Sequence, residues 1–402
     1  MVGRKYNRIM EIDILIVGAG IFGLTVAERS ACMGKKILVI DKRDHIGGNA
    51  YSEFDNETGI ECHKYGAHIF HTSDERVWAY VNKFTRFTNY VHKVYTTHNG
   101  EVYPLPINLG TINQFFRNNY TPSKAMDLIN EQAKEIGSVP QNLAEQCIAL
   151  IGRDLFCAFI KNYTAKQWQT PAEELPPEII KRLPVRYNYD NRYFDDSHEG
   201  LPADGYVKLF QNMINAGNSG KGSIEVRLNT DYFVDTEIQK LRHAKVQTVF
   251  TGPIDRFYDY KFGELKWRSL DLRKEIVDTY DFQGCPVMNY ADSDPKYTRI
   301  LEFKHFHTER ARDPEKWHGY AKCYNRTVIV REYSKTWEKN CEPYYPVNTS
   351  TDREKLVLYQ EQSKYDDHII FGGRLGEYAY YDMDKTFAAA LCLSDRLCCS
   401  RV

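Results

Sequence analysis

The sequence predicts an α/β fold, in which a parallel-sheet domain built from both ends of the chain is interrupted by a helical insertion and an antiparallel β-sheet domain. Three observations predict it. A strand, a glycine turn, a helix and a second strand follow one another between residues 12 and 41. A further strand followed by two glycines stands at residues 368–373. Between these ends lie a segment with helical spacing and, beyond residue 257, several short β-branched and aromatic runs.

The N-terminal unit has the pattern of a dinucleotide site. A β-branched run at residues 12–17 leads into Gly18-Ala19-Gly20-Ile21-Phe22-Gly23, and the second strand ends at Asp41. In such a unit the glycines permit a tight turn, close approach of a pyrophosphate and packing of helix on strand, while the acid accepts a ribose hydroxyl. We therefore expect Gly18, Gly20, Gly23 and Asp41 to bind a cofactor. The alternative is a glycine turn without a ligand and an Asp41 that only ends its strand.

The remaining elements follow in order along the chain. Residues 108–155 read as helices, with starts near Ser123, Pro140 and Asn142, and residues 171–205 read as loops and short strands. Further elements are strands at 224–228, 246–250 and 368–371 and a helix at 384–397. We assign 1–107, 210–265 and 350–402 to the parallel-sheet domain, 108–175 to a helical substrate or lid domain, and 176–209 with 266–349 to the antiparallel β-sheet substrate domain.

Composition limits the classes of function. The 402 residues carry a net charge of -1, with 42% hydrophobic and 27% charged residues, which is typical of a soluble globular protein and argues against bulk binding to nucleic acid. No apolar run is long enough for a membrane span and no signal peptide is visible, so we expect a cytoplasmic protein. The ten cysteines form no CxxC pair and no zinc-type cluster. We expect reduced thiols and no metal site.

Two further motifs bear on which cofactor is bound. Gly47-Gly48-Asn49 follows Asp41 closely and resembles the extension that flavoproteins of the glutathione-reductase superfold carry after their second strand. Near the C-terminus, Gly372-Gly373-Arg374 and Asp382-Met383 resemble the second flavin motif of that superfold. The resemblance implies an FAD-binding Rossmann-like domain. Because no second GxGxxG and no redox cysteine pair occur, we expect neither a separate nicotinamide domain nor disulfide chemistry.

Motifs along nearly the whole chain resemble the prokaryotic UDP-galactopyranose mutases. They lie at residues 65–72, 163–168, 181–186, 288–290, 298–300, 342–349 and 373–384. One departure is Gln169, at a position where relatives usually carry glycine.

This resemblance implies an isomerase that interconverts UDP-galactopyranose and UDP-galactofuranose without net redox change. In this family reduced FAD attacks the anomeric carbon through N5 and forms a covalent flavin–sugar adduct. The product supplies galactofuranose for cell-surface polysaccharide, NAD(P)H or another reductant acts transiently, and relatives are commonly homodimers. Neither a nucleic acid nor a membrane is an expected partner.

The resemblance also assigns roles to individual residues. Arg182 and Arg299 match the two arginines that clamp the diphosphate, and a guanidinium fork suits phosphate oxygens. Together with His68 they are the expected catalytic residues. The positions matching substrate-binding residues are Tyr163, Trp168, Tyr193, Asn289, Tyr345 and Tyr380. The positions matching flavin-lining residues are His68, His71, Arg374, Asp382 and Met383.

Residues 169–185 are predicted to form a mobile lid, because four prolines interrupt them and they carry Arg182. The alternative is a rigid loop whose arginine already sits in place. Two other functions stay open on the glycine motifs alone. An FAD-dependent oxidase or desaturase would consume an electron acceptor during turnover. A binding protein of the kind that escorts small GTPases would contain no flavin.

Overall fold

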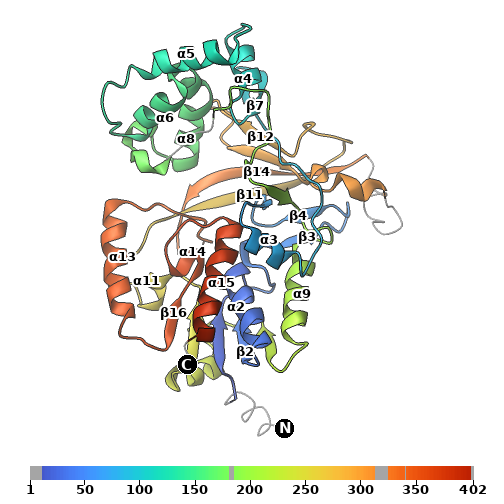
Figure 1. Ribbon diagram of the computed structural model, residues 1–402, viewed down its shortest axis with the longest axis vertical. Coiled ribbons are helices and arrows are strands. Elements are labelled where there is room, and N and C mark those ends of the chain that lie inside the picture. Colours follow the sequence, from blue (N-terminus) through green and yellow to red (C-terminus); the bar gives the residue numbers. More distant parts are fainter. Residues whose placement is uncertain (1–10, 181–184, 313–324, 340, 400–402) are drawn as a thin grey trace.

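The computed structural model describes residues 11–180, 185–312, 325–339 and 341–399. Arg182, one of the two predicted phosphate ligands, lies outside the described residues. Three regions follow one another along the long axis (Figure 1). A parallel sheet with its helices occupies one end, long strands cross the middle, and a group of helices forms the other end.

The parallel sheet has five strands in the order β16-β10-β1-β2-β9. They are β1 (Ile14–Val17), β2 (Lys36–Ile40), β9 (Ser223–Arg227), β10 (Gln247–Phe250) and β16 (Ile369–Phe371). All neighbouring pairs run parallel, and β1, β2 and β10 are almost wholly buried. These are the strands that the sequence predicts near both ends of the chain and in its middle. Their continuous apolar runs suit a sheet that is covered on both faces.

Helices cover both faces of this sheet. On one side α2 (Ile21–Cys32) packs between α9 (Tyr206–Gly217) and α15 (Met383–Cys399), as Figure 1 shows. Alternate residues of β1 divide between the faces: Ile14 and Ile16 join the core under these helices. Leu15 points to the other side, where the core includes residues of α10 (Thr236–His243). Also in this half are α3 (Glu75–Val81), α11 (Ile254–Phe257), α13 (Ser350–Ser363) and α14 (Gly373–Gly376).

The middle of the molecule is a seven-stranded sheet in the order β15-β11-β14-β13-β12-β6-β7. Its strands are β6 (Val94–His98), β7 (Glu101–Leu105), β11 (Trp267–Val277), β12 (Val287–Tyr290), β13 (Arg299–Glu302), β14 (Thr327–Thr336) and β15 (Tyr345–Pro346). The sheet is mixed, because β12 runs parallel to β6. Residues 94–105 therefore pair with this sheet, although the predicted boundaries group them with the parallel one. The sequence of a hairpin does not indicate which distant strand will pair with it.

The helical end contains α4 (Leu109–Phe115), α5 (Pro122–Ala133), α6 (Leu143–Ile151), α7 (Arg153–Leu155) and α8 (Lys161–Trp168). Asn142 caps α6 as predicted, and α5 starts at Pro122, next to the predicted Ser123, with Thr121 as its cap. A π-helical turn, residues 156–160, joins α7 to α8. Such turns shift the face that a helix presents and occur often at functional sites.

The remaining elements are short. Two small sheets pair β3 (Ser52–Phe54) with β4 (Glu61–His63), and β5 (Phe70–Thr72) with β8 (His198–Gly200). The described part of the predicted lid contains only 3-10 turns, at Ala172–Glu174 and Pro177–Ile179. Within the described residues, none of the helices combines the length and the apolar character that crossing a membrane requires.

Candidate functional site: a dinucleotide cavity beside an arginine–tyrosine cluster

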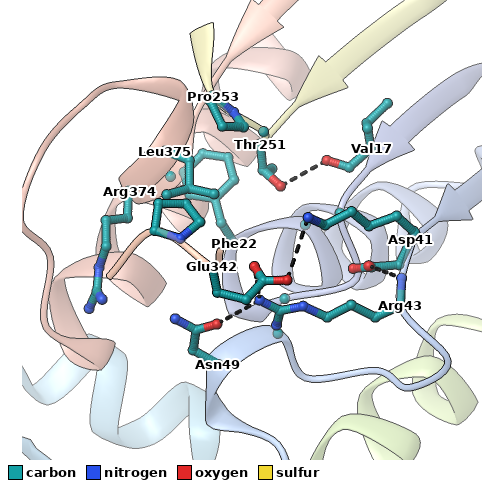
Figure 2. Close-up of a pocket in the computed structure, with 18 of the residues that line it drawn as sticks. Val17, Phe22, Asp41, Arg43, Asn49, Thr251, Pro253, Glu342, Arg374 and Leu375 are labelled. Carbon is teal, nitrogen blue, oxygen red and sulfur yellow. Dashed lines mark hydrogen bonds and ion pairs between the residues drawn. The ribbon is translucent and has the colours of Figure 1, made fainter. Parts of the chain in front are cut away.

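A cavity of about 700 Å³ opens at the carboxyl ends of the parallel strands (Figure 2). The turns after β1, β2, β10 and β16 all contribute to its lining. This edge of an open α/β sheet is where ligands bind, and the volume suits a cofactor. The cavity continues past the phosphate-binding turn to His68, Arg374 and Met383.

Glycine turns form one wall of this cavity. A Cβ on Gly18 would lie 2.0 Å from Thr251 Oγ1, and one on Gly23 would lie 2.0 Å from the carbonyl oxygen of Gly18. The second glycine turn, Gly47-Gly48, forms a β-bridge with the first turn through Gly20 and Gly47. The φ of Gly48 is 59°, in the left-handed region that favours glycine. Among the described residues, no side chain caps the start of α2. Its first N–H groups are therefore available to an anion, which is the arrangement that a dinucleotide needs.

Asp41 lines the cavity at the end of β2 and is only 9% exposed. Its carboxylate oxygens accept hydrogen bonds from the backbone N–H of Ala19 at 2.8 Å and of Arg43 at 2.9 Å. These two hydrogen bonds connect Asp41 to the turn after β1 and to the turn after β2. Because each carboxylate oxygen has a second lone pair, it can still accept a ribose hydroxyl.

The other predicted cofactor residues divide into two groups. Asn49, His68, Arg374 and Met383 line the cavity with the five glycines Gly18, Gly20, Gly23, Gly47 and Gly48. Asp382 and His71 are not among the lining residues. The Asp382 carbonyl accepts the N–H of Thr386 in the first turn of α15, and the His71 ring stacks on Phe194 at 3.7 Å.

His68 is held in one protonation state. Burial lowers the pKa of its imidazole to about 4, so the ring is neutral at pH 7. Its Nδ1 lies 2.8 Å from the carbonyl oxygen of Gly66 and donates to it, which leaves Nε2 unprotonated. His68 can therefore accept a hydrogen bond through Nε2 at neutral pH, while its single ring proton is already donated to Gly66.

A charged contact that sequence analysis did not assign spans the cavity (Figure 2). Glu342 accepts from Arg43 at 2.7 Å and lies 3.5 Å from Lys42, while Arg43 also donates to Asn49 at 2.9 Å. We call Lys42, Arg43 and Glu342 the latch. Burial raises the pKa of the Glu342 carboxyl, but the two cations outweigh it and the net shift is downward. The only sequence signal was the position of Glu342 at the start of the family-like motif at 342–349.

The predicted substrate residues gather around Arg299 on β13. Arg299 stands opposite Asn289 in the β12–β13 register, and its Nε lies 3.1 Å from the carboxylate of Glu332 on β14. Burial opposes the charge of Arg299, yet Glu332 and the nearby hydroxyls of Tyr163, Tyr345 and Tyr193 raise its pKa. Arg299 is therefore a permanent cation that lies against a carboxylate. Sequence analysis missed Glu332, which stands in none of the family-like motifs.

Asn289 offers an unused acceptor. Its Oδ1 is buried and has no hydrogen-bond partner among the described residues. A buried polar atom in this condition is uncommon in a native protein and indicates a missing ligand or water.

Arg374 joins the cavity to the Arg299 cluster. It lines the cavity and lies 5.4 Å from the ring centre of Tyr380, whose own ring is 5.9 Å from that of Tyr345. Its guanidinium donates to the backbone carbonyls of Tyr344 at 3.1 Å and Tyr381 at 2.7 Å. The two predicted sites are therefore neighbours that share one wall.

The helix α8 brings one of the two predicted nucleotide-binding aromatics, Tyr163, to the same cluster. Burial raises the pKa of the Tyr163 hydroxyl to about 12, and the charge of Arg299 opposes this rise. Trp168, at the end of α8, is half-buried against the helical core.

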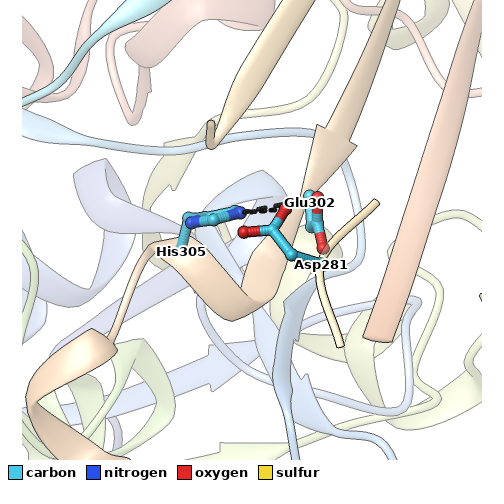
Figure 3. A group of neighbouring side chains, drawn as sticks. All are labelled: Asp281, Glu302 and His305. Atoms are coloured by element: carbon cyan, nitrogen blue, oxygen red, sulfur yellow. Dashed lines mark hydrogen bonds and ion pairs between the residues drawn. The ribbon is translucent and has the colours of Figure 1, made fainter. Parts of the chain in front are cut away.

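Figure 3 shows a second group of polar side chains, none of which lines the cavity. Asp281, Glu302 and His305 come within reach of one another, with His305 Nε2 3.2 Å from Asp281 and 3.5 Å from Glu302. The Glu302 carboxylate already accepts from the backbone N–H groups of Phe282 and Gln283 and from the Thr327 hydroxyl. Because these donors occupy its oxygens, the group fastens residues 281–284 to β13 and needs no ion to do so.

Known proteins share this sequence and this fold. A family model for UDP-galactopyranose mutase matches residues 158–380, and one for an NAD(P)-binding Rossmann-like domain matches residues 16–84. A probable UDP-galactopyranose mutase of Klebsiella pneumoniae is 41% identical over 383 residues, which cover 95% of this chain and 94% of the relative. A dTDP-fucopyranose mutase of Escherichia coli is 38% identical over 390 residues, 97% of each chain.

Solved structures agree at the level of the fold. A crystal structure of reduced UDP-galactopyranose mutase matches with a TM-score of 0.73 at 15% identity, covering 96% of this chain and 94% of that chain. A putative protoporphyrinogen oxidase from Exiguobacterium matches with a TM-score of 0.57 at 11% identity, covering 96% and 98%.

Proposed function

The chain belongs to the UDP-galactopyranose mutase family, and we propose that it interconverts UDP-galactopyranose and UDP-galactofuranose with bound FAD in its reduced form. The observation that carries the proposal is the contact of Arg374, which lines the cavity, with Tyr380, because it connects the cavity to the arginine–tyrosine cluster that we propose as the phosphate site.

The cavity supports FAD as the cofactor. Gly18, Gly20 and Gly23 with the open start of α2 would hold the pyrophosphate, Asp41 the ribose, and the wall containing His68, Arg374 and Met383 the ring system. When bound and reduced, the flavin supplies a nucleophilic N5 for covalent catalysis with no net change of redox state.

The chain's own side chains bind and orient the nucleotide sugar. Arg299 and Arg182 would neutralise the diphosphate while its bond to the sugar breaks, with hydroxyls of Tyr193, Tyr345 and Tyr380 donating to the same oxygens. Electrostatic stabilisation of this kind is the largest contribution in many enzymes. Glu332 holds Arg299 in place. Neutral His68 would accept a hydrogen bond on the cofactor side.

The wider context is part of the same proposal. Buried, unpaired thiols at Cys62, Cys147 and Cys285 support a reducing compartment, the cytoplasm. NAD(P)H or another reductant would prepare the flavin, the active form would be a homodimer, and galactofuranose would go to cell-surface polysaccharide.

The Escherichia coli relative makes the nucleotide a point to test. That protein is named for dTDP-fucopyranose and is nearly as similar to this chain as the Klebsiella protein.

The experiment compares reduced and oxidised protein. We expect dithionite-reduced protein to convert UDP-galactofuranose to UDP-galactopyranose, and oxidised protein to be inactive. Equal activity of both forms would refute the flavin's role. Faster conversion of dTDP-fucopyranose would assign the other sugar, while consumption of an electron acceptor in step with product would indicate an oxidase.

A further inference from the structure

We infer that Lys166 and Gln169 are positioning residues, which fix the last turn of α8 to the mixed sheet and so hold the uridine-binding aromatics in register with Arg299. The inference rests on the proposed function, because it takes Tyr163 and Trp168 as ligands of the nucleotide. We call the contacts of Lys166, Gln167 and Gln169 with the sheet the bracket.

Lys166 forms the first half of the bracket. Its ammonium donates to three backbone carbonyls, those of Tyr290 at 2.7 Å, Pro295 at 3.0 Å and Tyr297 at 3.1 Å. An ammonium has three N–H groups, so every donor is used. Desolvation lowers the pKa of this amine to about 8, with Asp292 and Asp294 opposing and Lys296 reinforcing the shift.

The positions of these carbonyls explain how Lys166 can connect α8 with the segments next to Asn289 and Arg299. Tyr290 is the last residue of β12 and directly follows Asn289. Tyr297 stands two residues before Arg299, which is the first residue of β13. Lys166 itself stands between Tyr163 and Trp168 on α8. One side chain therefore connects the residues proposed for uridine with those proposed for the diphosphate and the sugar.

Gln169 forms the second half, at the C-terminal end of α8. Its Nε2 donates to the carbonyl of Ser334 at 3.0 Å, and its Oε1 accepts from Thr336 Oγ1 at 3.0 Å and from Arg268 Nη1 at 3.3 Å. Ser334 Oγ also donates to the backbone carbonyl of Gln167.

The strand that receives Gln169 also carries Glu332, a member of the Arg299 cluster. Glu332, Ser334 and Thr336 alternate along β14, so their side chains share one face of the sheet. Glu332 fixes Arg299, and the next two positions on that face fix the end of α8.

The backbone conformation of Gln169 indicates that its side chain has a structural role. Its φ is 54° and its ψ is 30°, the left-handed region in which glycine is favoured at a helix end. Glycine would be the better residue for ending the helix. Glutamine is the poorer choice for the backbone, but it supplies contacts that glycine cannot make.

The test compares UDP affinity with thermal stability in flavin-loaded protein. Gln169→Gly removes the side-chain contacts and relieves the backbone, so we expect stability to be unchanged or higher while UDP binding by calorimetry weakens about 5-fold. Lys166→Met should weaken UDP binding about 10-fold and raise KM with little change in kcat, because it removes binding common to ground and transition states. Lys166→Arg should restore part of the loss.

The control is Lys161→Met, at the exposed first residue of α8, where the lysine lies 3.8 Å from Glu173. It should bind UDP like the unaltered protein. If Gln169→Gly binds UDP as tightly as the unaltered protein, the bracket does not position the nucleotide and the inference is wrong, even if Lys166→Met fails to fold. If the unaltered protein itself binds no UDP, the proposed function fails instead.

Discussion

The cofactor cavity and the Arg299 cluster are built in opposite ways. Backbone dominates the cavity, where glycine turns and the open start of a helix leave room for a ligand. Side chains dominate the cluster, where Arg299, Glu332 and three tyrosines arrive from separate elements. The cavity therefore depends on having no Cβ at a few positions, and the cluster depends on charge and hydroxyl groups. Single substitutions should therefore affect either cofactor binding in the cavity or turnover at the Arg299 cluster, but not both.

The largest effect should come from adding a Cβ to the first turn. In Gly23→Ala the new atom would lie 2.0 Å from a backbone oxygen that cannot move aside, so we expect the purified protein to lose nearly all its flavin. Gly137→Ala is the control, since a Cβ there meets nothing within 4 Å. Flavin absorbance per protein is the measurement. Normal flavin content in Gly23→Ala would show that the turn does not hold the cofactor.

Arg299→Ala should affect turnover and spare the cofactor. Removing a charged donor from a leaving group costs about 10²-fold or more in kcat/KM, and we expect the same of Arg182→Ala. Arg273→Ala, on β11 of the same sheet and 63% exposed, is the matched control and should be nearly neutral. A variant of Arg299 that loses flavin, or that keeps activity within about threefold, would contradict the division between the two regions.

Glu342→Gln should produce a moderate effect on the cofactor side alone. Breaking the latch leaves Arg43 and Lys42 without their shared carboxylate, so we expect flavin to dissociate several-fold faster in a dilution assay. The difference should shrink at high salt, which already screens the ion pairs of the unaltered protein. Glu225→Gln, at a surface pair on β9, should release flavin at the normal rate. Equal release rates for all three proteins would leave the latch without a role in retention.

The smallest effect concerns the group of Asp281, Glu302 and His305. Burial opposes the charge of His305, but the two carboxylates outweigh it and raise its pKa above the usual range of a histidine. Protonated His305 therefore stabilises the folded state. This stabilisation is complete below the pKa that His305 has in the unfolded state, and it disappears as the pH rises through the pKa that His305 has in the folded state. His305→Gln should therefore lower Tm by a few degrees at about pH 5.5 and by less at about pH 8.5. A pH-independent difference in Tm would contradict this assignment, and flavin content should not change.

The same contrast decides what the sequence could predict. The dinucleotide turn is local, so the spacing of Gly18, Gly20, Gly23 and Asp41 indicates it directly. The strands of the parallel sheet are buried apolar runs and were equally visible. The cluster depends on contacts between distant segments, and only the family resemblance indicated Arg299, Tyr163 and Tyr345.

Other features were beyond prediction for physical reasons. Glu332 reads as one charged residue of an alternating strand, and only the β13–β14 register places it against Arg299. Lys42 and Arg43 meet Glu342 although Arg43 and Glu342 are 299 positions apart in the sequence. The β6–β7 hairpin gives no sign in sequence of its parallel partner β12.

The central claim is that the two regions serve one reaction without net redox change. The direct test reduces the flavin once, without oxygen, and then supplies UDP-galactofuranose in large excess over enzyme. We predict that many molecules of UDP-galactopyranose form per flavin and that the flavin absorbance remains that of the reduced form at the end. Conversion that stops at one product per flavin, or flavin that is oxidised in proportion to product, would contradict the account.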